Sequence, residues 1–167
     1  MKQINKDFLA SAKQNGNICK EGKDIIKRAE SQDELVEYFK KNIVWLMKNN
    51  YPNESELMQY FNGFVSEWLA VNALNAEFKD SSIVCLLCGS RATATYSTNS
   101  RGRLFVRHNS KLTLNVDKGG YCIMSLYENA QAKIEAAEGA EVFVFLFDNA
   151  TVVETQESKD IIIIKRQ

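Results

Sequence analysis

Four residues whose side chains can bind a metal ion recur at intervals of twenty residues. They are Cys88, His108, Glu128 and Asp148, and His108 is the only histidine of the chain. A thiol, an imidazole and two carboxylates together can bind a divalent metal. Glu128 and Asp148 also form a pair of carboxyl groups of the kind that glycosidases use as acid and base. The simpler interpretation is that polar residues are expected beside turns.

The residue that follows each of these four predicts a sharp corner of the chain. Gly and Asn adopt the left-handed backbone conformation more readily than other residues, and a small residue comes next each time. The predicted corner column is Gly89, Asn109, Asn129 and Asn149, followed by Ser90, Ser110, Ala130 and Ala150.

Aliphatic residues follow the same period of twenty. After Asp80 the hydrophobic pattern alternates in short runs, which is typical of β-strands. One aligned column contains Val84, Leu104, Met124, Val144 and Ile164. A repeat of this kind predicts a short parallel β-solenoid of about four 20-residue rungs over residues 81–167, with rungs about 4.8 Å apart. Such stacking places the four metal-ligand candidates in a row instead of around one centre, which disfavours a metal site.

Residues 1–80 show a helical pattern instead. Ser31 and Glu34 form a capping-box pair at the start of a long amphipathic stretch that predicts one helix over 31–50. Further helices are expected over 19–30, 51–61 and 64–78. The helix over 51–61 should begin with a cap at Asn53 or Ser55. The predicted fold class is therefore α+β, with a helical N-terminal region at 1–80 and a β-solenoid at 81–167.

The two outer faces of the predicted coil differ in polarity. One face presents threonines, lysines and other polar side chains, which we expect to lie in water. The other face is too apolar to be left wet, so we expect the helices or a second copy of the chain to cover it. Its candidate interaction residues are Phe105, Tyr127, Phe143, Phe145, Phe147 and Ile163.

The C-terminal end of the coil breaks the pattern. Glu154 and Gln156 fall at inward positions, so we expect the strand register to slip there. The final strand, "DIIIIKRQ", is strongly apolar. It is either buried or an edge for self-association, because the last rung of a solenoid leaves backbone groups unpaired.

Composition excludes several classes of partner. The 167 residues have a formal net charge of 0, with 45% hydrophobic and 25% charged residues, so the chain lacks the basic field of a nucleic-acid-binding protein. No apolar run approaches the roughly 20 residues that span a bilayer, and the N-terminus has no apolar signal segment. We therefore predict a cytoplasmic protein with neither a nucleic-acid nor a membrane partner. No cofactor is predicted, because no phosphate loop, nucleophile elbow or HExxH motif is present.

Several stretches carry a family resemblance: residues 39–63, "HNSKLTLNV" at 108–116, and the "ENA" and "DNA" corners. With these, the chain resembles an uncharacterised bacterial family, met as hypothetical proteins with a suggested mobile-element origin. The resemblance implies a short helical N-terminus and a C-terminal β-solenoid, and it implies no activity or catalytic residue. The chain is more loosely similar to the bactofilins, cytoskeletal β-solenoids that polymerise end to end, but their rungs are shorter and they lack such a helical region.

These observations favour a non-enzymatic structural or interaction module. Its expected partner is a second copy of the chain or another protein, because short undecorated corners leave little room for a pocket. The alternative is a carbohydrate-binding or carbohydrate-active protein, since parallel β-helices present flat ladders of polar side chains to polysaccharides.

Overall fold

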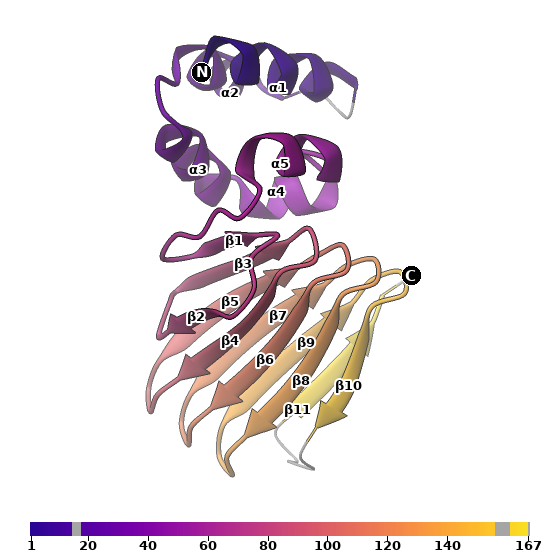
Figure 1. The fold of residues 1–167 in the computed structure, drawn as a ribbon. Helices are drawn as coiled ribbons and strands as arrows, with labels where there is room; N and C mark the ends of the chain where they lie inside the picture. Colours follow the sequence, from indigo (N-terminus) through magenta and orange to yellow (C-terminus); the bar gives the residue numbers. More distant parts are fainter. Residues whose placement is uncertain (15–17, 156–160, 167) are drawn as a thin grey trace. The chain divides into compact units, whose positions relative to one another are not determined.

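The computed structural model describes residues 1–14, 18–155 and 161–166 (Figure 1). The chain divides into two units, a helical unit at residues 1–60 and a coil of parallel strands at residues 61–167. None of the helices in the described residues is long and apolar enough to cross a membrane. Each unit has its own set of internal contacts.

The helical unit is built from short capped helices. Ser31 Oγ accepts a hydrogen bond from the Glu34 N–H at 3.2 Å, as the sequence predicts. Asn53 Oδ1 accepts from the Glu56 N–H at 3.0 Å, and Glu56 in return accepts from the Asn53 N–H, which completes a reciprocal cap. The helices are α1 (Lys2–Gln14), α2 (Lys20–Arg28), α3 (Gln32–Lys41), α4 (Ile43–Lys48) and α5 (Glu54–Phe61).

The single helix predicted over 31–50 is wrong, because it breaks at Asn42. There the backbone leaves the helical region, with φ −116° and ψ 14°, and α4 begins at the next residue. The Asn42 side chain donates to the Tyr38 carbonyl at 2.9 Å. An asparagine side chain that competes for backbone groups in this way favours the end of a helix over its interior.

Aromatic side chains form the core of the helical unit around Phe8, which is fully buried. Its ring lies 5.8 Å from that of Phe39 and 5.7 Å from that of Tyr60, measured between centroids. The Tyr51 hydroxyl donates to the Phe8 carbonyl at 2.9 Å, so this buried polar group is paired. These contacts join α1, α3 and the α4–α5 region into one hydrophobic unit.

The coil contains two parallel sheets that the chain enters alternately (Figure 1). Within the described residues, one sheet has the order β1-β3-β5-β7-β9-β11 and the other β10-β8-β6-β4-β2. The strands are β1 (Leu69–Val71), β2 (Ala76–Lys79), β3 (Ile83–Leu87), β4 (Arg91–Tyr96), β5 (Arg101–Val106), β6 (Lys111–Val116), β7 (Tyr121–Leu126), β8 (Gln131–Ala136), β9 (Glu141–Leu146), β10 (Thr151–Thr155) and β11 (Ile161–Lys165).

The predicted period of twenty residues is confirmed by the strand register from β3 to β9. It is wrong at β11, where Ile163 and not the predicted Ile164 pairs with Val144. Val84 pairs with Leu104, Leu104 with Met124, and Met124 with Val144. In the second sheet, Leu112 pairs with Ala132 at the same offset. The fold is therefore an α+β protein whose C-terminal part is a parallel β-solenoid of about four 20-residue rungs.

The helix predicted over 64–78 is wrong, because this segment forms β1 and β2. Both strands pair with the following rung at an offset of sixteen residues, Leu69 with Cys85 and Ala76 with Ala92. Asn72 and Asn75 have positive φ values of 46° and 60°, so they turn the chain between the two strands. The strands therefore begin well before the predicted boundary at residue 80, and a shorter rung precedes the four regular ones.

The interior of the coil is filled by inward residues of both sheets. Tyr96 is fully buried, and its hydroxyl donates to the Ser81 carbonyl at 2.8 Å. Gly102, on the neighbouring inward position of β5, makes room for this ring, since an added Cβ would lie 2.2 Å from the Tyr96 hydroxyl oxygen. In the following rungs the equivalent pairs are Val116 with Cys122 and Ala136 with Val142.

The register slip expected near Glu154 is confirmed by a bulge at Val153. Val152 pairs with Ala132, but Glu154 pairs with Lys133, an outward-facing position of β8. Val153 is left outside the pairing and is 59% exposed. The other residue named in that prediction, Gln156, lies outside the described residues.

Candidate functional site

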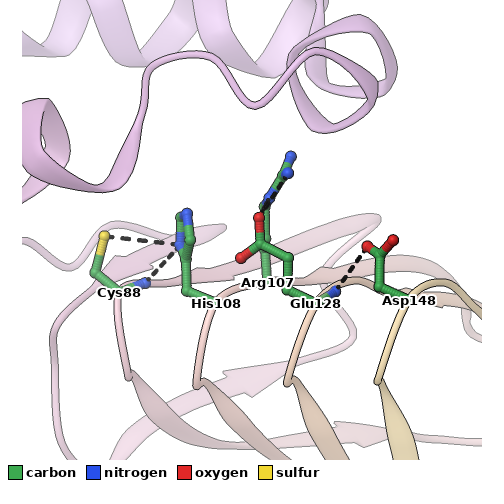
Figure 2. Close-up of polar contacts among 5 residues, drawn as sticks. All are labelled: Cys88, Arg107, His108, Glu128 and Asp148. Atoms are coloured by element: carbon green, nitrogen blue, oxygen red, sulfur yellow. Dashed lines mark hydrogen bonds and ion pairs between the residues drawn. The ribbon is translucent and has the colours of Figure 1, made fainter.

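The four metal-ligand candidates occupy equivalent positions at one corner of successive rungs (Figure 2). Each follows a strand of the six-stranded sheet, and each has the left-handed backbone conformation that the corner requires. Their φ values are 58° at Cys88, 60° at His108, 58° at Glu128 and 55° at Asp148. These four residues therefore form the corner column of the coil.

The predicted left-handed role of the asparagines is wrong. Asn109, Asn129 and Asn149 stand at the corners and are exposed, but only Gly89 of the predicted column has a positive φ, at 76°. The turn that reverses the chain places the left-handed residue one position earlier. The small residue after each asparagine faces the interior, where Ser90, Ser110, Ala130 and Ala150 are all buried.

Two members of the column bind the backbone of the preceding rung. His108 Nδ1 accepts a hydrogen bond from the Cys88 N–H at 3.1 Å, and Asp148 Oδ2 accepts from the Glu128 N–H at 3.2 Å (Figure 2). Because His108 Nδ1 is the acceptor, the neutral ring carries its proton on Nε2. Each side chain thus satisfies an N–H that the corner would otherwise leave without a strand partner.

Glu128 makes a different contact, an ion pair with Arg107. Glu128 Oε1 accepts from Arg107 Nε at 2.9 Å and from Nη2 at 2.7 Å (Figure 2). The Arg107 side chain is only 10% exposed, and that of Glu128 is 30% exposed. A charge-assisted pair in this half-buried setting is stronger than an exposed one and links adjacent rungs at the corner.

The structure brings Cys88 and His108 together but separates the rest of the column. Cys88 Sγ lies 3.9 Å from His108 Nδ1, whereas Glu128 binds Arg107 and Asp148 binds a backbone N–H. Among the described residues of the coil, no three of these four side chains bring their ligand atoms to one point. Their geometry suits corner stabilisation. The metal site and the carboxyl pair for glycoside hydrolysis stay predictions.

Comparison with known proteins identifies no relative of this chain. No family model, no curated protein and no solved structure matches the chain. The resemblances to an uncharacterised bacterial family and to the bactofilins therefore stay predictions.

The predicted apolar face lies on the outside of the six-stranded sheet, and its rings stack along the rungs. The rings of Tyr127 and Phe147 are parallel within 5°, with centroids 4.7 Å apart, and Tyr121 lies 5.7 Å from Phe143. Phe105 is buried, whereas the later aromatic residues of this face are only partly buried. These cross-rung contacts shield much of the face from water without a partner.

Arginine side chains cover three rings of this face. The guanidinium carbons lie 5.4–5.7 Å from the ring centroids, the range of cation–π contacts. The pairs are Arg103 with Phe105, Arg107 with Tyr127 and Arg166 with Phe145.

Ile163 does not lie on this apolar face. β11 pairs with β9 at an offset of nineteen residues, so Ile163 stands beside Val144, an inward position, and Ile162 stands beside Phe143. Ile163 is nevertheless 43% exposed, because it belongs to the last rung.

Two buried cysteines of the coil, Cys85 and Cys122, are poor nucleophiles. Burial raises the pKa of the Cys122 thiol to about 12 and also raises the pKa of Cys85. Both thiols are thus protonated at neutral pH, and the thiolate is the reactive form. They act as small apolar residues of the coil.

Proposed function

We propose that the protein is a non-enzymatic interaction module in which the last rung of the coil pairs with the last rung of a second copy. The corner residues that were candidates for metal binding or catalysis already form contacts between rungs. The proposal rests on a difference between the two ends of the coil, because the outer edge of β1 is paired and that of β11 is not within the described residues.

At the first end of the coil, the edge of the six-stranded sheet is closed by its own chain. The Val71 N–H donates to the Phe64 carbonyl at 2.9 Å, and the Gly63 N–H donates to the Val71 carbonyl at 2.9 Å. The Ser66 N–H donates to the Leu69 carbonyl at 2.8 Å. Residues 63–66 thus pair antiparallel with the outer edge of β1, and the backbone of this edge is satisfied.

The last end has no such cover within the described residues. β11 is the final strand of its sheet, and its Arg166 N–H donates inward to the Leu146 carbonyl at 2.8 Å. Backbone groups point alternately to the two sides of a strand, so Ile162 and Ile164 bond to β9 in the same way as Arg166. The N–H and C=O groups of Ile161, Ile163 and Lys165 therefore point away from the sheet.

Apolar side chains accompany these backbone groups. Ile162 and Ile163 are 47% and 43% exposed, and Val153 on β10 is 59% exposed. An edge strand with exposed isoleucines is a template for pairing with another strand, and natural proteins usually protect it. Here the protection is expected from a second copy.

A second copy fits this end by symmetry. Two identical edges related by a two-fold axis pair antiparallel. β11 then pairs with β11 of the partner, and the six-stranded sheet continues from one copy into the other. A head-to-tail chain of copies would need the outer edge of β1, which residues 63–66 already occupy. The predicted assembly is therefore a closed dimer.

Light scattering over a protein concentration series tests this proposal. We expect the wild-type chain to reach twice its mass of 19.0 kDa, and Ile163→Pro to remain at a single chain mass. The proline removes an N–H from the outer edge but none from the β9 pairing, and edge strands tolerate proline. Leu74→Lys is the matched control, because Leu74 is 68% exposed but lies between β1 and β2 at the other end.

Circular dichroism separates loss of association from loss of folding. Ile163→Pro should keep the strand signal of the wild type, and Ile163→Lys serves as a second variant that leaves the backbone unchanged. A wild-type chain that stays monomeric at high concentration would overturn the proposal. So would an open-ended series of masses, or a dimer that both Ile163 variants retain.

A further inference from the structure

The outer face of the five-stranded sheet carries polar side chains in register. One column contains Arg91, Lys111, Gln131 and Thr151, which pair in sequence across β4, β6, β8 and β10. The next column contains Thr93, Thr113 and Lys133. In-register parallel strands hold the members of each column about 4.8 Å apart. The side chains of this face therefore form a regular ladder.

Two cations in this ladder have no acidic residue in their own column. Arg91 and Lys111 are exposed and directly paired, and neither forms an ion pair within the described residues. Their column continues with Gln131 and Thr151, so no carboxylate follows them along it. Like charges placed directly opposite each other are destabilising unless an anion lies between or above them.

These cations border a shallow hollow in the face. Its volume is about 310 Å³, and it spans β4, β6 and β8. Its lining contains Arg91, Lys111 and Gln131 of the first column, Thr93, Thr113 and Lys133 of the next column, and Val153 of β10.

The charge of the surrounding face is positive. Outward positions of β2, β4, β6 and β8 hold four cations, Lys79, Arg91, Lys111 and Lys133, and two anions, Glu77 and Glu135. A third anion, Glu154 of β10, pairs in register with Lys133. Glu135 is occupied by Lys133, at 3.1 Å between Nζ and Oε1. The protein as a whole has a net charge of 0, so this excess is a local feature.

We propose that this face binds a linear acidic polysaccharide, one whose sugar units carry carboxylates. Guanidinium and ammonium groups bind carboxylates, and the threonine and glutamine side chains between them suit sugar hydroxyl groups. The ladder repeats at an interval close to the length of one sugar unit, so successive units meet equivalent side chains. The polymer lies across the strands, along the axis of the coil.

Other polymers fit the face less well. Neutral polysaccharides are usually held by stacking on aromatic rings, and no aromatic side chain faces outward on the described part of this sheet. Single-stranded nucleic acid also depends on aromatic stacking, and double-stranded DNA demands a larger basic field than two unpaired cations. A positively charged face without aromatic side chains therefore favours an acidic polysaccharide.

Isothermal titration calorimetry with polygalacturonate tests the proposal, with dextran as the neutral polymer and double-stranded DNA as the other polyanion. We expect binding of polygalacturonate that weakens as salt rises, and no binding of dextran. The double variant Arg91→Gln/Lys111→Gln should weaken binding about tenfold. Arg101→Gln is the control, because Arg101 is an exposed arginine on β5, in the other sheet.

Three results would overturn the proposal. They are no measurable binding of polygalacturonate, equal binding of dextran, or an affinity that the double variant leaves unchanged. DNA binding as tight as that of polygalacturonate would overturn it as well, since it would make the face a general polyanion surface. Both substitutions are at exposed positions, so the variants should melt with the wild type, which a thermal scan checks.

Discussion

At the first end of the coil, residues 63–66 donate and accept hydrogen bonds along the outer edge of β1, whereas at the last end the outer edge of β11 has no partner within the described residues. The strands themselves do not explain this difference, because β1 and β11 both lie at edges of one sheet. The difference arises from the chain that precedes β1, which folds back as an antiparallel segment.

The comparison shows how a solenoid can be finished in two ways. A coil of stacked rungs exposes backbone groups at each end, and both ends must be covered for a soluble protein. In the proposed dimer, residues 63–66 cover one end and an identical partner covers the other, which would limit assembly to two copies. The exposed isoleucines lie at the end that the partner would cover.

The largest effect should come from removing the anchor of the covered end. Trp68 is 3% exposed, and its carbonyl accepts from the Cys85 N–H at 2.7 Å. Trp68→Ala leaves a cavity, and we expect a loss of about 3–5 kcal/mol in the free energy of unfolding. Urea unfolding measures this loss.

The matched change at the other end is Ile163→Ala. Ile163 is 43% exposed in a single chain, so the dilute monomer should lose less than about 1 kcal/mol. Equal losses in the two variants at low protein concentration would break the comparison between the ends.

An intermediate effect is expected at the corner column, in the rungs between the ends. His108→Ala removes the acceptor for the Cys88 N–H and places alanine at a φ of 60°. A buried N–H without its partner costs about 1–3 kcal/mol, which thermal or urea unfolding resolves.

His108→Asn is the control for that variant. Asparagine tolerates the left-handed conformation and keeps an acceptor near the position of Nδ1, so it should recover most of the stability. Asn109→Ala should have little effect, because Asn109 is exposed and does not have a positive φ. A larger loss from Asn109→Ala than from His108→Ala would contradict the assignment of the corner column.

The smallest effect concerns the pH dependence of the first rung. Hydrogen bonds from Ser100 and from the Ser97 N–H lower the pKa of Asp80, which stands at the end of β2. A lowered pKa in the folded state means that this carboxylate stabilises the fold above the pKa of the unfolded chain. The contribution is lost as pH falls through the folded-state pKa.

Thermal unfolding of the wild type and Asp80→Asn between about pH 2 and pH 6 measures this contribution. The wild type should melt higher near pH 6, and the two curves should converge toward pH 2, where Asp80 is protonated. A constant difference across this range would show that Asp80 acts through packing and not through its charge.

The regular rungs could be predicted from the sequence because one residue stacks on its equivalent twenty positions away. Aliphatic columns such as Val84, Leu104 and Met124 fix both the period and the inward face, and the register confirms them. The contacts at the corner follow from the same period, since His108 and Cys88 differ by twenty. Which side-chain atom accepts which N–H depends on backbone angles that the residue types did not reveal.

The two ends could not be predicted as well, because the period changes there. The segment 64–78 contains apolar residues at helical spacing, and its offset of sixteen hides it from a search at twenty. The sequence signal for a turn between two strands was the pair Asn72 and Asn75, because asparagine tolerates the left-handed conformation that both adopt. At the other end, the bulge at Val153 and the offset of nineteen moved Ile163 from the outer face to the inward column.

Amide hydrogen exchange of β11, followed residue by residue by NMR at low and high protein concentration, tests the open last rung most directly. The N–H groups of Ile162 and Ile164 should be protected at both concentrations, because they bond to β9. Those of Ile161 and Ile163 should exchange rapidly in dilute solution and become protected at high concentration, while Val71 at the covered end stays protected throughout. Exchange at Ile163 that is fast at both concentrations would contradict pairing with a second copy.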